Sequence, residues 1–351
     1  MNTLYIDLEQ IKKNYLFAKK VTNSKIAAVV KSDCYGLGVN ILAPFISQLG
    51  CRDFFVSNLK EGIFLRKIFK KKRNINIYIL QGITLFPLQK ILENKLIPVL
   101  SSNEEVILWN NFSKIQRKKL PCVINIDTGM KRTGLNFFEF KNLNINYIEI
   151  KYILSHLSYQ NDPNNEYHKK QLIFFNKIKN YLNNFKYTLA SSIGLSLDRK
   201  YHFDMLRIGE NLFLNDVISL YTKIINISII HNTTCIGYNC TYKAKKGEII
   251  AVLPIGYSHG YSKKFGNIAY ASIEGYLVPV IGEISMEMTV INITNLPLNL
   301  QKIGKRVELI GPNYPLEKLC KEANVEISEI MVSLKKIKRM YKFSSIRPSV
   351  C

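Results

Sequence analysis

Short hydrophobic runs alternate with polar turns and helix-like segments over the first two-thirds of the chain. Most of these runs are nearly continuous rather than alternating, which is typical of strands covered on both faces. Eight of them predict strands: Lys25–Asp33, Phe54–Asn58, Ile75–Gly82, Leu96–Ser102, Cys122–Gly129, Lys151–Ser158, Tyr187–Ser192 and Phe203–Gly209. Between them, His168–Phe185 has the clearest helical period. Its apolar residues are expected on one core-facing side: Phe174, Phe175, Ile178, Tyr181, Leu182 and Phe185.

Eight such units predict a TIM-like (β/α)8 barrel over residues 8–220. A doubly wound sheet is the alternative, but it usually has fewer strands and a GxGxxG loop after the first strand, where this chain has KSDCYGLG at Lys31–Gly38. Beyond residue 220, strand-like runs follow at short spacing: Ile224–Ile230, Ile249–Pro254, Ile268–Ile273, Val278–Ile281, Thr289–Ile293 and Arg306–Ile310. They predict an antiparallel β domain over residues 221–351, which we expect residues 1–7 to join.

The composition is that of a globular protein, with 47% hydrophobic and 21% charged residues. The chain opens without the pattern of a signal peptide and has no apolar run long enough to cross a bilayer. We therefore expect a cytoplasmic protein that has no membrane partner. The seven cysteines are scattered and form no CxxC pair, so free thiols are expected and neither a disulfide framework nor a metal site.

A nucleic-acid partner is suggested by the net charge, since 49 Lys and Arg residues against 26 Asp and Glu residues give +23. The lysines, however, are spread along the whole chain beside Asn and Ile, as in Lys70–Ile77, and are not interleaved with aromatic residues. Such runs are usually solvated faces. We therefore expect no nucleic-acid partner.

Candidate chemistry lies where barrel enzymes place it, at the C-terminal ends of the strands. These ends collect the following residues: Lys31, Arg132, His156, Ser192, Arg207 and Gly209. A lysine at the end of an apolar strand is favoured as a neutral, nucleophilic amine. The spacing alone leaves equally open a Lys31 that reaches solvent or pairs with Asp33. It also leaves open a core role for His156 and turn roles for Ser192 and Gly209.

Six segments carry further motifs, in this order: AVVKSDCYGLG at Ala28–Gly38, DTGMKRTGL at Asp127–Leu135, LRIG at Leu206–Gly209, TYKA at Thr241–Ala244, PIGYSHG at Pro254–Gly260 and IGEISME at Ile281–Glu287. They resemble the A-V-V-K-A-x-A-Y-G-H-G, D-T-G-M-x-R-x-G, V-R-P-G, G-A-T-Y-x-A, P-I-G-Y-A-D-G and V-G-R-V-S-M-D motifs of alanine racemases, which are fold-type III pyridoxal-phosphate enzymes. The resemblance spans essentially the whole chain, from Leu4–Leu8 to the C-terminal domain.

The resemblance implies interconversion of L-alanine and D-alanine, supplying D-alanine for peptidoglycan. Lys31 would carry pyridoxal 5'-phosphate and act as one base. Tyr242, from the partner subunit of a homodimer with shared sites, would act as the opposed base, because racemisation needs one group to remove the α-proton and another to deliver one. Positive charge that makes Tyr242 a better base would come from Arg132, Arg207 and His156.

The resemblance assigns the remaining site residues as well. Arg207 would contact the pyridine nitrogen and be steadied by His156, which keeps the ring a modest electron sink and favours reprotonation over transamination. Three residues would hold the cofactor phosphate: Tyr35, Ser192 and Gly209. Arg132 and the Met286 N–H would hold the substrate carboxylate.

Four departures from the family pattern concern the site. Asn125 stands where many members have a carbamylated lysine that fixes the substrate-binding arginine, and an anion such as chloride would be one substitute. Leu37 replaces the histidine of the YGHG motif, and Glu210 replaces an apolar residue. For the phosphate-binding tyrosine near the C-terminus, Tyr341 aligns ambiguously.

Other functions remain as alternatives. A fold-type III enzyme acting on serine, or a cofactor-binding protein with weakened catalysis, would share these motifs. A pyridoxal-phosphate homeostasis protein lacks the β domain, and a fold-type III decarboxylase has a Gly-rich phosphate stretch that we do not find here. A non-catalytic binding protein would not need both Lys31 and Tyr242.

Overall fold

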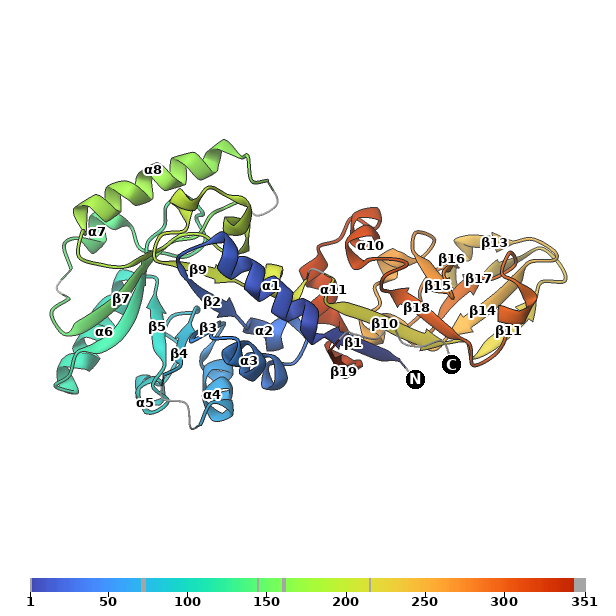
Figure 1. The fold of residues 1–351 in the computed structure, drawn as a ribbon, viewed down its shortest axis with the longest axis horizontal. Helices are drawn as coiled ribbons and strands as arrows, with labels where there is room; N and C mark the ends of the chain where they lie inside the picture. The colour runs from blue at the N-terminus through green and yellow to red at the C-terminus, as the bar shows by residue number, and fades with distance from the viewer. Residues whose placement is uncertain (1, 71–73, 144, 160–161, 215, 344–351) are drawn as a thin grey trace. The chain divides into compact units, whose positions relative to one another are not determined.

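The protein is described by a computed structural model covering residues 2–70, 74–143, 145–159, 162–214 and 216–343. Contacts divide the chain into two compact units (Figure 1), which we describe separately. The barrel unit comprises Lys12–Cys34 and Gly38–Leu212. The sheet unit comprises Met1–Ile11, Tyr35–Leu37 and Phe213–Cys351.

The barrel unit contains an eight-stranded parallel sheet in the order β8-β7-β6-β5-β4-β3-β2-β9. Its strands are β2 (Lys25–Val29), β3 (Asp53–Val56), β4 (Asn76–Ile79), β5 (Ile97–Leu100), β6 (Leu120–Asn125), β7 (Ile148–Leu154), β8 (Tyr187–Thr188) and β9 (Met205–Ile208). The edge strands β8 and β9 meet, because Asp204 N donates to Tyr187 O at 3.0 Å and Thr188 Oγ1 donates to Met205 O at 2.8 Å. The predicted (β/α)8 barrel is confirmed, and all eight predicted ranges overlap its strands.

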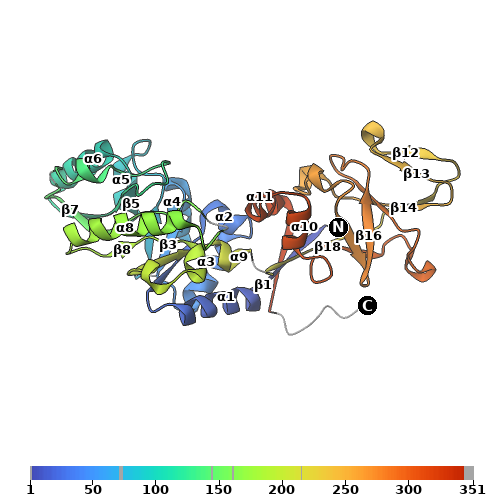
Figure 2. The same cartoon turned by 90° about the horizontal axis from the view of Figure 1, so that it is seen from above.

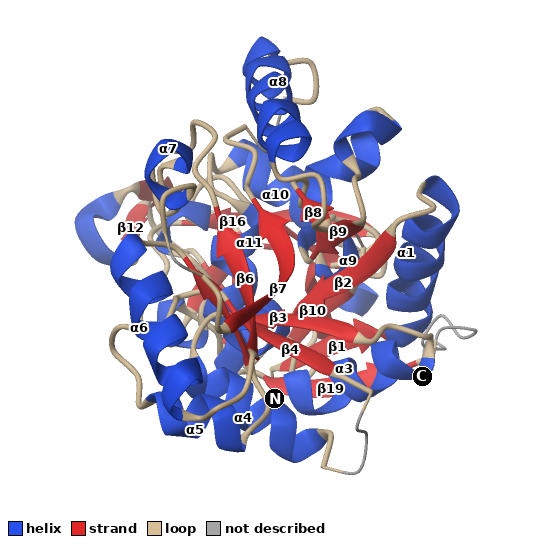
Figure 3. Ribbon diagram, turned by 90° about the vertical axis from the view of Figure 1, so that its left-hand side faces the viewer, coloured by secondary structure: helices blue, strands red, loops and turns tan. Residues whose placement is uncertain are grey.

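Helices surround the barrel strands (Figure 3). They are α1 (Leu8–Val21), α2 (Lys31–Tyr35), α3 (Val39–Gln48), α4 (Leu59–Ile68), α5 (Leu88–Glu93), α6 (Asn103–Ile115), α7 (Phe137–Phe140), α8 (Glu166–Tyr181) and α9 (Glu210–Phe213). In α8, Phe175 and Ile178 are buried as predicted, but Tyr181 is 62% exposed. The predicted apolar side was wrong at this end, because the helix stops at Tyr181 and leaves Leu182 and Phe185 beyond it.

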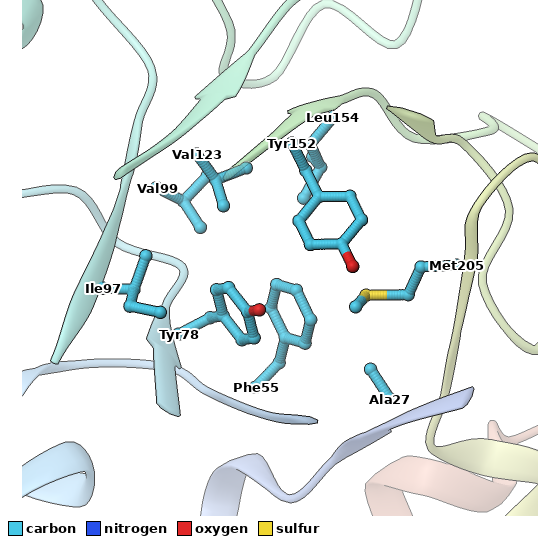
Figure 4. Close-up of a cluster of buried hydrophobic side chains, with 9 residues drawn as sticks. All are labelled: Ala27, Phe55, Tyr78, Ile97, Val99, Val123, Tyr152, Leu154 and Met205. Atoms are coloured by element: carbon cyan, nitrogen blue, oxygen red, sulfur yellow. The ribbon is translucent and has the colours of Figure 1, made fainter. Parts of the chain in front are cut away.

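The interior of the barrel is a packed core (Figure 4). The buried cluster consists of Ala27, Phe55, Tyr78, Ile97, Val99, Val123, Tyr152, Leu154 and Met205. The rings of Phe55 and Tyr78 stack with centroids 4.4 Å apart, and Tyr78 Oη donates to Asp53 at 2.9 Å. Since side chains fill the inside, reactive groups have room only at the strand ends and in the loops that follow.

The sheet unit contains a nine-stranded sheet in the order β11-β14-β17-β16-β15-β18-β10-β1-β19, antiparallel except for β1 with β19. Its strands are β1 (Thr3–Asp7), β10 (Ile218–Lys223), β11 (Asn226–Ile229), β14 (Ile249–Leu253), β15 (Tyr270–Ile273), β16 (Tyr276–Ile281), β17 (Thr289–Asn292), β18 (Arg306–Ile310) and β19 (Lys338–Lys342). A separate hairpin of β12 (Thr234–Ile236) and β13 (Tyr242–Ala244) lies beyond β14 in Figure 2. Helices α10 (Leu316–Glu322) and α11 (Ile327–Ser333) complete the unit.

The sequence patterns predicted this unit less completely than the barrel. β10, β12, β13 and β19 were missed. β10 spans the expected domain boundary at residue 220, and most residues of the other three strands are polar or only partly buried, so these three lack the apolar signal of a core strand. No helix in the described part of the chain is both long and apolar enough to span a membrane.

Candidate active site

Lys31 follows strand β2 after one intervening residue, Val30, and opens a left-handed turn of the backbone. The next four residues have positive φ angles: Ser32 (51°), Asp33 (59°), Cys34 (54°) and Tyr35 (55°). None is a glycine, and a residue with a Cβ costs about 1–2 kcal/mol in this region. Strain of this kind persists only where the surrounding structure over-determines it, and it concentrates at functional sites.

Hydrogen bonds hold the left-handed turn from both sides. Asp33 accepts from Val39 N at 2.7 Å through Oδ1 and from Gly38 N at 2.8 Å through its backbone carbonyl. Glu61 accepts from Ser32 N at 2.9 Å. Asp33 therefore fixes the loop that follows Lys31, a role that the sequence patterns did not indicate.

Arg207 is buried on β9, beside β2, with Ala27 as its register partner. Its Nη1 donates to Thr188 Oγ1 at 2.5 Å, and its Nη2 donates to Ser155 O at 2.7 Å and Leu189 O at 3.1 Å. Among the described residues, none accepts a hydrogen bond from Arg207 Nε. The guanidinium is thus rigidly held by two of its nitrogens, and its Nε–H remains available as a donor.

His156 lies against Arg207, with its Nδ1 3.3 Å from Arg207 Nη2. Because the guanidinium can only donate, Nδ1 must accept and the ring proton belongs on Nε2. Burial lowers the pKa of His156 to about 3, and the charges of Arg207, Arg132 and Lys31 add to this. His156 is therefore neutral, so the expectation that it supplies positive charge was wrong.

The charges of three sequence-predicted strand-end residues act on His156. Arg207, Arg132 and Lys31 all lie near enough to His156 to disfavour its protonation. Burial lowers the pKa of Arg207 to about 9, which leaves the guanidinium charged at neutral pH. The guanidinium of Arg207 therefore lies beside a neutral imidazole at this end of the barrel.

Ser192 joins the ends of β8 and β9. Its Oγ accepts from Gly209 N at 3.1 Å and from Asn211 N at 3.3 Å. Two donors occupy the lone pairs of this hydroxyl, so its own proton points away from them. The Gly209 N–H, which was expected to face a ligand, is instead directed at Ser192.

Arg132 lies in a loop that folds back after β6. Asp127 N donates to Leu135 O at 3.0 Å, and Leu135 N donates to Asn125 O at 2.8 Å. Gly134 makes this possible, because a Cβ there would lie 2.7 Å from Asp127 N and its φ is +129°. The loop leaves the Arg132 side chain exposed.

Asn125 occupies the position where many family members have a carbamylated lysine. It is buried, and its Nδ2 donates to Ser101 Oγ at 3.1 Å and Thr133 Oγ1 at 3.4 Å. Within the described part of the chain, Arg132 has no hydrogen-bond or ion-pair partner. Asn125 therefore shapes the loop through Thr133 and does not hold the arginine itself.

In the sheet unit, Tyr242 opens β13 and is half-buried. Its Oη donates to Glu248 Oε2 at 3.1 Å and accepts from Asn292 Nδ2 at 3.3 Å. Burial raises the pKa of Tyr242, the Asn292 hydrogen bond acts in the opposite direction, and Glu248 raises it further. Neither Glu248 nor Asn292 was found from the sequence, because they lie outside the six motifs.

Two motifs of this unit pack on each other around Gly256. Tyr257 N donates to Ser285 O at 3.1 Å, and Ser258 N donates to Met286 O at 2.9 Å. A Cβ at Gly256 would lie 2.2 Å from Ser285 O, so only glycine fits. No described residue accepts a hydrogen bond from the Met286 N–H.

The segment Tyr35–Leu37 belongs by its contacts to the sheet unit. The ring of Tyr35 packs on Phe213 with centroids 5.8 Å apart. A Cβ at Gly36 would lie 2.6 Å from Met331 O, and its φ is +86°. Tyr341 Oη donates to Leu37 O at 2.7 Å. This hydroxyl proton therefore stabilises the Tyr35–Leu37 segment and is not directed at a phosphate.

One expectation about the cysteines is corrected. Cys235 and Cys240 form a disulfide, with Cα atoms 4.9 Å apart. The register of the hairpin places Cys235 opposite Lys243, and the left-handed conformation of Cys240 turns the chain back toward it. The free thiols among the described residues are Cys34, Cys51, Cys122 and Cys320, all buried, and Cys351 lies outside the described residues.

Comparison with protein families finds two matches that together cover most of the chain. Residues 6–216 match the family model "Alanine racemase, N-terminal domain". Residues 217–341 match "Alanine racemase, C-terminal domain".

Individual relatives agree with these matches. An alanine racemase of Rickettsia canadensis is 33% identical over 343 residues, which cover 95% of this chain and 96% of that protein. A solved alanine racemase of Bartonella henselae, with covalently bound pyridoxal phosphate, superposes with a TM-score of 0.91 at 31% identity, covering 97% of this chain and 99% of that one. The alanine racemase of Streptomyces coelicolor, at 18% identity, has the same fold with a TM-score of 0.90.

Proposed function

The chain belongs to the alanine racemase family, and from that premise we propose that it interconverts L-alanine and D-alanine with pyridoxal 5'-phosphate, Lys31 and Tyr242 being its two bases. The observation that carries the proposal is the cluster at the barrel strand ends. There Arg207 contacts the neutral His156 at 3.3 Å, and the charges of Arg132 and Lys31 also disfavour protonation of this histidine.

Donors around this cluster fit an anionic, nitrogen-containing cofactor. Arg207 Nε has no acceptor among the described residues, although the rest of the guanidinium is held firmly. The Ser192 oxygen already accepts two backbone hydrogen bonds, so its hydroxyl proton is available to donate to a ligand. We assign Arg207 to the pyridine nitrogen, Ser192 and Tyr35 to the phosphate, and Gly209 to the support of Ser192.

Pyridoxal phosphate, when bound, withdraws electrons from the substrate Cα and thereby makes its proton acidic. Lys31 and Tyr242 then exchange that proton from opposite sides, and inversion follows when one removes it and the other delivers. Arg132 and the Met286 N–H bind the substrate carboxylate, which sets the orientation of the α-proton.

Arg207 limits how strongly electrons are withdrawn. A guanidinium that stays protonated donates a hydrogen bond to the ring nitrogen and has no proton to give up to it. His156, held neutral, accepts from the same guanidinium and cannot act as a competing acid. This arrangement favours return of the proton to Cα over transamination.

Arg207→Glu is expected to lower racemisation at least ~10-fold and to raise the share of transamination, because a carboxylic acid can protonate the ring nitrogen. Pyruvate and D-alanine are measured together from L-alanine. Arg207→Lys is the matched control, since it keeps a positive charge near Ser155 O and Leu189 O. If the product ratio and the rate both stay at wild-type values in Arg207→Glu, this role of Arg207 is excluded.

The proposal includes a homodimer in which each site combines Lys31 of one chain with Tyr242 of the other. Lys31→Ala and Tyr242→Phe chains, each inactive, are expected to recover about a quarter of wild-type activity when mixed, because random pairing restores one site in half of the dimers. Racemisation is assayed after subunit exchange, with each variant alone as the control. Verified heterodimers that stay inactive would refute shared sites.

The overall activity is tested with the purified protein and added pyridoxal phosphate. D-alanine is expected from L-alanine, and a parallel assay with L-serine separates an alanine racemase from an enzyme of broader range. A protein that binds the cofactor but turns over neither amino acid would favour the alternative of a non-catalytic binding protein.

A further inference from the structure

Three polar side chains form a closed hydrogen-bonded triangle around the Tyr242 hydroxyl. Glu248 precedes β14, and Asn292 ends β17, whose register pairs it with Ile250. Tyr242 Oη donates to Glu248 Oε2 at 3.1 Å. Asn292 Nδ2 lies 3.3 Å from Tyr242 Oη and 3.1 Å from the same Glu248 oxygen.

The triangle fixes both the position of the phenol and the direction of its proton. The ring of Tyr242 packs on a buried apolar cluster that includes Ile236 and Ala244, which restricts its rotation. The hydroxyl proton points at the Glu248 carboxylate, and the amide of Asn292 can donate to both oxygens but cannot take up a proton. One lone pair of Tyr242 Oη therefore remains for an incoming proton.

A neutral phenol is a weak base, and the surroundings of Tyr242 keep it neutral. Burial and the adjacent carboxylate both raise its pKa. A phenol of this kind accepts a proton effectively only if it releases its own at the same time. Its hydrogen-bonded neighbour Glu248 is a carboxylate whose Oε2 already accepts from this hydroxyl and can take up the released proton.

We propose that Glu248 is the terminal proton acceptor of a relay through Tyr242, an inference that rests on the proposed function. The Cα–H bond of L-alanine breaks as an O–H bond forms on Tyr242 Oη. The original Tyr242 O–H bond breaks as Glu248 Oε2 becomes protonated. Charge is conserved, because the carboxylate is neutralised, the phenol stays neutral, and the negative charge passes to the electron pair of the broken Cα–H bond, which bound pyridoxal phosphate would stabilise. In the reverse direction, the protonated Glu248 resupplies Tyr242 as it protonates Cα.

The discriminating variant is Glu248→Gln, which keeps the size and hydrogen bonding of the side chain but cannot accept the proton. In the holoenzyme in deuterated water, loss of the α-proton from L-alanine is expected to fall at least ~10²-fold. Loss from D-alanine, which proceeds through Lys31, persists. Glu248→Asp keeps a carboxylate and is expected to recover part of the exchange. Glu274→Gln, which removes a carboxylate paired with Lys305 elsewhere in the unit, is the matched control.

A second readout does not depend on activity. NMR titration of the full chain with ¹³C-labelled tyrosine follows ionisation of Tyr242, whose signal is identified by its absence in Tyr242→Phe. Glu248→Gln is expected to move this titration to lower pH, because the carboxylate no longer repels the phenolate. If Glu248 only perturbed the phenol electrostatically, the same variant would exchange L-alanine as fast as wild type or faster.

The outcomes distinguish failure of the Glu248 relay from failure of the proposed role of Tyr242 as a base. Slow L-alanine exchange in Glu248→Gln together with the lowered titration supports the relay. Wild-type exchange in Glu248→Gln, with Tyr242→Phe impaired, overturns the relay alone. Unimpaired exchange from L-alanine in Tyr242→Phe overturns the proposed role of Tyr242, and the relay with it.

Discussion

Lys31→Ala is expected to lose covalent attachment of the cofactor and at least ~10⁴-fold of racemisation, since it removes both a nucleophilic amine and a proton-transfer group. The place of Lys31 in the fold explains this expectation. The residue follows the apolar strand β2 and is held by a left-handed turn that Asp33 and Glu61 stabilise.

The measurement is the visible absorbance that pyridoxal phosphate acquires when it is attached to a lysine, together with its disappearance on borohydride reduction. Lys25→Ala is a matched control, because Lys25 is an exposed lysine at the opposite end of the same strand. It is expected to keep both absorbance and activity. If the Lys31→Ala protein still attaches the cofactor and racemises alanine at the full rate, Lys31 is not the cofactor-binding lysine.

Tyr242→Phe is expected to lose ~10²–10⁴-fold of racemisation, which is the contribution of a well-placed proton-transfer group. The ring remains in its apolar packing, so the loss reflects the hydroxyl and not the fold. Cofactor attachment should be unchanged, because Lys31 is intact.

The decisive observation is which enantiomer of alanine loses α-proton exchange in Tyr242→Phe. In deuterated water, the α-proton of D-alanine should still exchange, because it faces Lys31, whereas that of L-alanine should not. Each enantiomer is followed separately by NMR. Equal exchange from both at wild-type rates would contradict the two-base mechanism.

The sequence patterns were most informative where strands are buried on both faces. Such strands read as continuous apolar runs, so all eight barrel strands were predicted, and the C-terminal strand ends then identified Lys31, His156 and Arg207 as neighbours. The strands β12, β13 and β19 were missed because they are half-exposed and carry no comparable signal.

Other features depend on long-range contacts that no local pattern contains. Four residues with Cβ atoms adopt a left-handed turn against their own preference, because Asp33 and Glu61 supply the hydrogen bonds that hold it. Cys235 and Cys240 pair because of the hairpin register, and His156 is neutral because burial and neighbouring cations disfavour its charge.

The sequence by itself determined the barrel, the family and the residues that carry the chemistry, since local periodicity and contiguous motifs encode them. Only the tertiary structure decided the protonation of His156 and the surroundings of Tyr242. Glu248 and Asn292 lie six and fifty positions beyond Tyr242 and meet it through sheet pairing. Protonation depends on burial and on charges that are brought together by folding, so it cannot be read from the order of residues alone.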